Sequence, residues 1–153
     1  MDVSMTQREA FIWYAERFIG RPYIWGGDDP MAGFDCSGLI VEAGMAVGLY
    51  TADDTARGLY ARGKIVAAPA SPGDLVFWGT RVGDSQSIEH VEILWDKAGG
   101  MWLSLGAGGG GSKILTLADA IAANAFVRIR PVRPGSRHLF FSDPFSVQSR
   151  SPD

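Results

Sequence analysis

Apolar residues recur at helical spacing in the first part of the chain. Between residues 6 and 19 they repeat every three or four positions, which predicts an amphipathic helix that Gly20 and Pro22 end. A second helix is predicted from Asp35 or Cys36 to Gly48, since Asp is a favoured residue at a helix start. A short third helix is predicted over 53–62.

Beyond Pro69 the pattern changes to short runs rich in β-branched and aromatic residues, bounded by turn-forming residues, which is typical of strands. Such runs cover 73–79, 89–95, 101–107 and 126–132. A short helix is predicted over 116–124. Helices followed by a mostly antiparallel meander indicate one α+β domain over residues 1–141. Residues 142–153 have no periodicity and are predicted to form a flexible tail.

Composition narrows the class of protein. The chain has 153 residues, of which 46% are hydrophobic and 20% are charged, as in soluble globular domains. A net charge of −3 argues against a nucleic-acid partner. No apolar run approaches the roughly 18 residues that a membrane span needs. The start, MDVSMTQREAFIWY, lacks the basic region of a secretory signal, so we expect synthesis in the cytoplasm.

Cofactor and metal motifs are not evident in the sequence. One cysteine and two histidines exclude a disulfide framework and a cysteine-rich zinc site. The glycine run GAGGGGSK, residues 106–113, lacks the spacing of a phosphate-binding loop and is predicted to form a mobile rim of a cleft. We therefore expect neither a metal nor a cofactor.

The single cysteine, Cys36, has two interpretations. A lone cysteine often packs as a small buried residue. If Asp35 caps the helix, however, Cys36 lies in its first turn, where the helix dipole favours a thiolate and free N–H groups can bind an oxyanion.

A cysteine nucleophile needs a base, and only His90 and His138 are available. His138 follows the last predicted strand, and a packing or surface role is expected for it. His90 and Glu92 alternate with Val91 and Ile93 along a predicted strand, so the first pair projects away from the apolar side. A solvated strand histidine is the other interpretation of His90.

Three blocks in order carry a family likeness: RPYIWGG with GFDCSGLI, then SPGDLVFW, then EHVEILW. Together they resemble the NlpC family of papain-like cell-wall cysteine peptidases, over about residues 6–132. The resemblance implies a papain-like α+β fold with N-terminal helices packed on a mostly antiparallel sheet. It implies hydrolysis of peptidoglycan stem peptides, usually between D-glutamate and a diamino acid.

The resemblance also implies roles for individual residues. Cys36 matches the nucleophile and His90 matches the general base. Tyr23 matches a tyrosine that lines the site near the oxyanion. The remaining candidates, expected to bind or shape the site for the substrate, are Trp25, Asp35 and Ser37.

The family's third polar residue, usually on the strand after the base, is missing here, because Gly106 occupies its position. Three substitutes stay open: Glu92, Ser104, or a water molecule against a backbone carbonyl. Glu92 is the favoured candidate, since it shares a strand face with His90 and could fix the imidazole tautomer. A hairpin centred near Ala98 would place Gly106 opposite His90 and Ser104 opposite Glu92.

The biological setting is expected from the same resemblance. The ending AFVRIRPVR resembles phage or prophage tail-associated members, which implies tail-hub partners, a virion location and action on the periplasmic cell wall. Two alternatives remain. One is a structural or assembly module of the tail with weak or lost catalysis, and the other is a papain-like amidase or acyltransferase.

Overall fold

Three capped helices begin the fold. The computed structural model describes residues 5–29, 33–69 and 71–147. The helices are α1 (Gln7–Glu16), α2 (Cys36–Ala46) and α3 (Ala56–Arg62), and in each the side chain before the first residue accepts a backbone N–H from the first turn. All three were predicted, although α1 and α2 end two or three residues earlier than expected.

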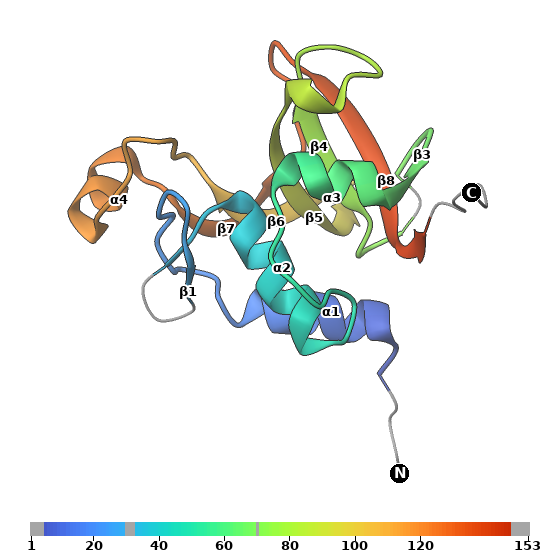
Figure 1. Cartoon of the computed structure of the whole chain (residues 1–153), viewed down its shortest axis with the longest axis horizontal. Coiled ribbons are helices and arrows are strands. Elements are labelled where there is room, and N and C mark those ends of the chain that lie inside the picture. Colours follow the sequence, from blue (N-terminus) through green and yellow to red (C-terminus); the bar gives the residue numbers. More distant parts are fainter. Residues whose placement is uncertain (1–4, 30–32, 70, 148–153) are drawn as a thin grey trace.

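A six-stranded antiparallel sheet forms the rest of the core, with strand order β3-β8-β4-β5-β6-β7 (Figure 1). The strands are β3 (Gly63–Val66), β4 (Leu75–Gly79), β5 (Ile88–Ala98), β6 (Met101–Gly108), β7 (Phe126–Pro131) and β8 (His138–Val147). The smaller elements are β1 (Asp28–Asp29) and β2 (Gly33–Phe34), the single-turn helix η1 (Ser85–Ser87), and α4 (Leu117–Ala123). The predicted α+β class with a mostly antiparallel sheet is confirmed.

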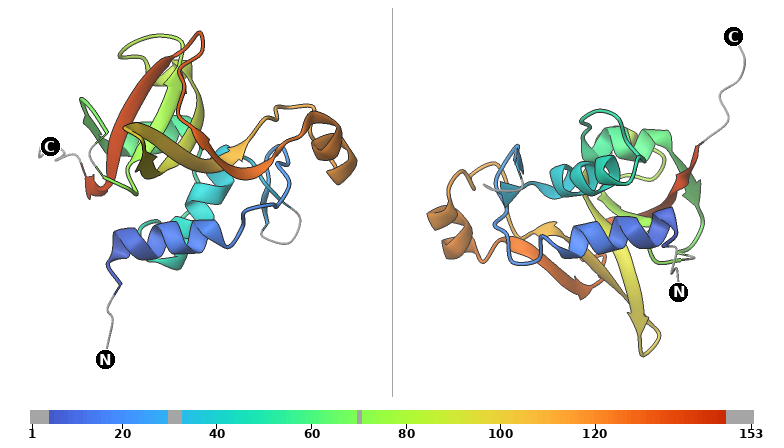
Figure 2. Two further views of the ribbon diagram at one scale, coloured as in Figure 1. Left: turned by 180° about the vertical axis from the view of Figure 1, so that it is seen from behind. Right: turned by 90° about the horizontal axis from the view of Figure 1, so that it is seen from below.

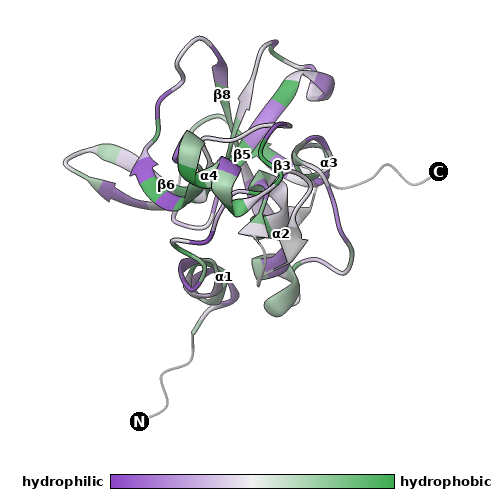
Figure 3. Cartoon of the chain, turned by 90° about the vertical axis from the view of Figure 1, so that its left-hand side faces the viewer, coloured by the Kyte–Doolittle hydropathy of each residue, from purple (hydrophilic) through white to green (hydrophobic). Residues whose placement is uncertain are grey.

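The two faces of the sheet differ, as the alternation of strand residues requires. One face packs with α1 and α2 on the main apolar core, which includes Phe11, Leu39, Phe77, Val91 and Leu105. The other face carries a smaller apolar cluster around Val76, Trp78 and Leu94. Figure 2 shows the three helices gathered on one side of the sheet, and Figure 3 shows hydrophobic and hydrophilic segments alternating along the strands.

The tail predicted from Ser142 begins too early. Strand β8 runs to Val147 and lies between β3 and β4, and Ser142 is fully buried. The strand was missed because its pairing jumps from Val147 opposite Gly63 to Asp143 opposite Lys64, which leaves Pro144 in a bulge. Residues 148–153 lie outside the described part of the chain.

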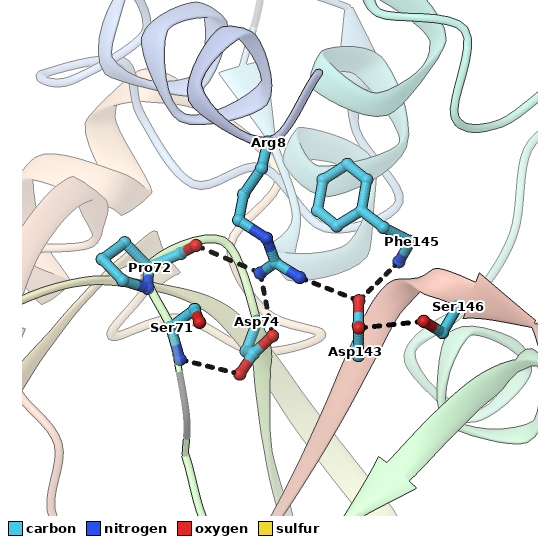
Figure 4. A network of polar contacts seen from close by, with 7 residues as sticks. All are labelled: Arg8, Ser71, Pro72, Asp74, Asp143, Phe145 and Ser146. Carbon is cyan, nitrogen blue, oxygen red and sulfur yellow. Dashed lines mark hydrogen bonds and ion pairs between the residues drawn. The ribbon is translucent and has the colours of Figure 1, made fainter. Parts of the chain in front are cut away.

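A polar network fastens α1 to this strand (Figure 4). The Arg8 guanidinium lies 2.8 Å from Asp74 and 2.9 Å from Asp143, and it also donates to the carbonyl of Pro72. Asp143 in turn accepts the N–H of Phe145. Helix α1, the turn before β4 and the end of β8 are therefore held by one side chain.

The β5–β6 hairpin corrects the predicted register. Gly99 and Gly100 form its two-residue turn with φ of 59° and 81°, the left-handed conformation that such tight hairpins require. A bulge at Trp95 then shifts the pairing, so that Ile93 lies opposite Leu105. Continued by one residue, this register puts Glu92 beside Gly106, two residues from the expected pairing with Ser104.

Candidate active site

Cys36 is the first residue of α2. The Asp35 side chain caps the helix by accepting the Gly38 N–H at 2.7 Å. Cys36 is free and partly exposed, and it lines a cleft with Tyr23 and His90. The predicted position at a helix start is confirmed, and it gives the sulfur the favourable end of the helix dipole.

His90 and Glu92 project from the same face of β5 and contact one another. His90 Nε2 lies 2.6 Å from Glu92 Oε2, so the ring N–H donates to the carboxylate. The imidazole also packs on the Trp78 ring, with 5.0 Å between centroids. Nε2 is engaged by Glu92, so Nδ1 is the ring nitrogen that remains, and the imidazole lines the same cleft as Cys36.

The Glu92 carboxylate is buried, with 1% of the residue exposed. Ser104 Oγ donates to its Oε1 at 2.7 Å, and Arg130 Nη2 lies 3.5 Å from its Oε2. Of the three substitutes that the sequence left open, two make contacts here: Glu92 contacts the histidine, and Ser104 donates a hydrogen bond to Glu92.

Burial and pairing act in opposite directions on the two titratable groups. Burial disfavours the charged imidazole, but hydrogen bonds with Cys36 and Glu92 outweigh it and raise the pKa of His90 to about 9. Burial likewise opposes ionisation of Glu92, while the hydrogen bond from His90 lowers the pKa of the carboxyl below its usual value. An imidazolium beside a carboxylate is thus the stable state near neutral pH.

The glycine run after Leu105 makes room for functional side chains. A Cβ at Gly106 would lie 2.7 Å from Glu92 Cδ, and one at Gly108 would lie 2.6 Å from Arg130 Nη2. A Cβ at Gly110 would lie 2.6 Å from Tyr23 Cε1. We call Gly106, Gly108 and Gly110 the glycine row. Close approach explains these three glycines, and Gly108–Gly111 line the cleft, as the predicted rim requires.

Two cavities flank Cys36. The cleft that it shares with His90 has a volume of about 390 Å³ and is lined on one side by Gly108–Gly111. The second cavity, of about 570 Å³, is lined by Asp35 and Ser37. Tyr23 and Trp25 line both cavities. All seven predicted site residues except Glu92 therefore border the space around the sulfur, and Glu92 reaches it through His90.

Tyr23 is nearly buried, and burial raises the pKa of its hydroxyl, followed by the nearby Cys36 and Asp35. The phenol therefore stays protonated and can donate a hydrogen bond. Trp25, by contrast, is 53% exposed.

Sequence reasoning missed Trp78 and Arg130, which touch His90 and Glu92. Strand alternation could have placed them, since both lie on the face that His90 uses. His138 opens β8, near the Phe140 ring, and lines neither of the two cavities beside Cys36.

The described ranges contain neither a candidate metal site nor a helix that could span a membrane. Over 5–29, 33–69 and 71–147, no three His, Cys, Asp or Glu side chains gather in a way that could hold a metal ion. Among the same residues, none of the helices has the length and apolar character needed to cross a bilayer.

Three comparisons relate this chain to known proteins. A model of the NlpC/P60 family matches residues 20–129. The bifunctional muramidase/DL-endopeptidase CwlT of Bacillus subtilis is 40% identical over 91 residues, which is 59% of this chain and 27% of CwlT. The probable endopeptidase YafL of Escherichia coli is 37% identical over 95 residues, 53% of this chain and 38% of YafL. This chain thus matches well under half of either relative.

Solved structures extend the likeness to nearly the whole fold. The peptidoglycan hydrolase RipB of Mycobacterium tuberculosis has 25% identity and a TM-score of 0.67, covering 92% of this chain and 65% of that one.

Proposed function

The chain belongs to the NlpC/P60 family, and on that premise we propose that it is a cysteine endopeptidase acting on peptidoglycan stem peptides. One observation carries the proposal: a thiol at a helix start shares a cleft with a histidine that is itself held by a buried carboxylate. The names of CwlT and RipB, an endopeptidase and a peptidoglycan hydrolase, support the substrate class. The bond proposed is the one between D-glutamate and a diamino acid.

The reaction follows from the positions of three groups. His90 holds the proton of the Cys36 thiol, and the thiolate attacks the scissile carbonyl carbon. The negative charge that develops on the carbonyl oxygen is stabilised by the Cys36 backbone N–H and the Tyr23 hydroxyl. The His90 imidazolium then protonates the leaving amine, and water hydrolyses the thioester to release the acid and restore the thiol.

Glu92 is proposed as the positioning residue for His90. Its carboxylate fixes the tautomer in which Nε2 carries a proton, which leaves Nδ1 to take the thiol proton. Ser104 and Arg130 occupy further lone pairs of the carboxylate, which keeps it from turning away. Asp35, Ser37 and Trp25 are proposed to bind the acyl side of the substrate, since they line the cavity of about 570 Å³.

The test compares the wild-type chain with Cys36→Ala on purified peptidoglycan, with released fragments identified by mass spectrometry. The wild type is expected to release fragments that end in γ-D-glutamate, and the variant to release none above background. A matched control is His138→Ala, which removes a histidine outside the cleft and should keep full activity. Equal release by Cys36→Ala would overturn the mechanism.

An inactive assembly module is the contrasting candidate. The missing side chain at position 106 favoured it, and RipD of Mycobacterium tuberculosis, described as non-catalytic, shares the fold at 20% identity and a TM-score of 0.66. Here Glu92 makes the contact that the side chain would have made. An amidase or acyltransferase would use the same sulfur, and a panel of short γ-glutamyl peptides and amine acceptors separates these reactions.

We propose a phage-tail setting on the resemblance of AFVRIRPVR alone. Tail-hub proteins would then be the partners, and the virion would carry the enzyme to the periplasmic wall. Co-purification with tail-hub proteins from virion preparations is the expected result. A strictly free monomer in those preparations would count against it.

A further inference from the structure

A third cavity, of about 370 Å³, lies beyond His90 and is lined by three arginines. Arg130, Arg133 and Arg137 line it together with His90, Glu92 and Ser104. Two of these arginines, Arg130 and Arg137, also line the cleft that holds Cys36. The two cavities therefore share a boundary, and the arginines extend the cleft on the histidine side of the sulfur.

Positive charge is concentrated around this cavity, although the chain as a whole is negatively charged. The whole chain has a net charge of −3, yet residues 126–142 contain four arginines and neither Asp nor Glu. The carboxylates that pair with the cavity arginines are Glu92, which is committed to His90, and Glu89. This end of the cleft is suited to an anionic group.

The cavity arginines have hydrogen-bonding capacity left. Arg130 and Arg137 each approach one carboxylate, Glu92 and Glu89, at the long distance of 3.5 Å. A guanidinium has several N–H donors in a planar fork, and one long contact leaves most of them available. The Arg133 guanidinium makes no hydrogen bond or ion pair with any residue in the described ranges.

The side of the cleft identifies the part of the substrate. His90 must protonate the amine that leaves, so the residue bearing that amine lies on the His90 side of Cys36. This is the side on which Arg130 and Arg137 line the cleft. The opposite cavity, with Asp35 and Ser37, receives the acyl portion.

We propose that Arg137 and Arg133, with Arg130, bind an ionised carboxylate on the leaving-group residue of the substrate. This specificity rests on the proposed endopeptidase function. Arginine pairs bidentately with carboxylates, and a carboxamide of the same size offers one acceptor oxygen and no charge. The enzyme therefore distinguishes a wall peptide with a free carboxylate at this position from one in which the group is amidated.

The experiment uses two synthetic γ-D-glutamyl-diamino acid peptides that differ only in a carboxylate or a carboxamide on the diamino acid. Wild-type enzyme is expected to cleave the carboxylate peptide with a kcat/KM about tenfold higher, a modest factor because the arginines are partly exposed. The double variant Arg133→Gln/Arg137→Gln should cleave both peptides at the slower rate. Arg130 is left intact because it contacts Glu92.

The control is Arg81→Gln, which removes one arginine that pairs with Asp84 and lines none of the three cavities. It should keep the wild-type preference. Equal rates on the two peptides by wild-type enzyme, or a preference that survives in the double variant, would overturn the carboxylate site and leave the endopeptidase function standing. Failure of wild-type enzyme to cleave either peptide or purified peptidoglycan would instead reject the function.

Discussion

The Glu92 side chain fills the space in which a side chain on Gly106 would have to stand. A Cβ added to Gly106 would lie 2.7 Å from Glu92 Cδ and 2.9 Å from its Cβ, closer than real Cβ atoms come to other heavy atoms. The carboxylate that holds His90 therefore comes from the histidine's own strand, two residues later, and β6 contributes the room for it.

Replacing Glu92 with Gln tests its positioning role. The amide keeps the size of the side chain and loses its charge, so kcat/KM should fall by about tenfold to a hundredfold. Because Glu92 helps to raise the pKa of His90 to about 9, the variant should lose the imidazolium at lower pH. The alkaline limb of the kcat/KM profile should then move toward acid, and an unmoved limb would contradict the role.

The steric overlap between Glu92 and any side chain at position 106 can be measured as a coupling energy between the two positions. Gly106→Ala in the wild-type chain should lower the free energy of unfolding by about 2 kcal/mol, since the methyl group overlaps Glu92. In a Glu92→Ala background the same change should cost less than about 0.5 kcal/mol. Urea unfolding of the four chains gives both values, and equal costs in the two backgrounds would rule out the steric overlap.

The His90–Glu92 pair makes stability depend on pH. The folded pKa of His90, about 9, lies above its ordinary value of 6.5, so the native state holds a proton that the unfolded chain releases. The stabilisation is complete below pH 6.5 and is lost as the pH rises toward 9. The free energy of unfolding should fall by about 2 to 3 kcal/mol across that window.

The matched comparison is Glu92→Gln, in which the fall with pH should be smaller because the His90 pKa is nearer to its ordinary value. Chemical unfolding at half-unit steps of pH gives both curves. A wild-type stability that is flat between pH 6.5 and 9 would refute the pairing.

The Arg8 network is expected to matter for stability and not for chemistry. Arg8→Gln should lower the free energy of unfolding by about 2 kcal/mol, because Asp74, which is buried, and Asp143 lose a shared cation. Arg8→Lys should recover less than half of that lost stability, since one ammonium group cannot reproduce the planar set of N–H donors of a guanidinium. Thermal unfolding measures both.

Arg62→Gln is the control for this network. Arg62 pairs with Asp54 at the surface, and its loss should stay within about 0.5 kcal/mol. A loss for Arg8→Gln no larger than that of the control would show that the network is dispensable.

Local signals in the sequence were sufficient for the helices and four of the strands. Caps and apolar periodicity are properties of neighbouring residues, and Asp35 and Thr116 cap as expected. Strands β3 and β8 were missed because they are defined by pairing with each other and with β4, far apart in sequence. The register near Glu92 was predicted two residues off because the turn lies at Gly99 and Gly100 and not near Ala98, while the bulge at Trp95 shifts the pairing back by one residue.

The residues of the candidate site likewise fall into those that the sequence could predict and those that it could not. Cys36 and His90 could be found from the family likeness, and Glu92 from strand alternation. The contact of Arg130 with Glu92 and the roles of the glycines could not, because each depends on which residue of a neighbouring strand or loop lies beside it. The alternation of residues along one strand indicates which face a residue uses, but not which residue stands opposite.

The glycine row has a consequence for how variation in this chain is interpreted. Gly106, Gly108 and Gly110 contribute no functional group, yet each borders a side chain that the site needs. A survey that looks for a polar residue at position 106 would score this chain as a degenerate enzyme. A survey that instead seeks a carboxylate two residues after the histidine, together with glycine on the facing strand, would recognise the arrangement seen here.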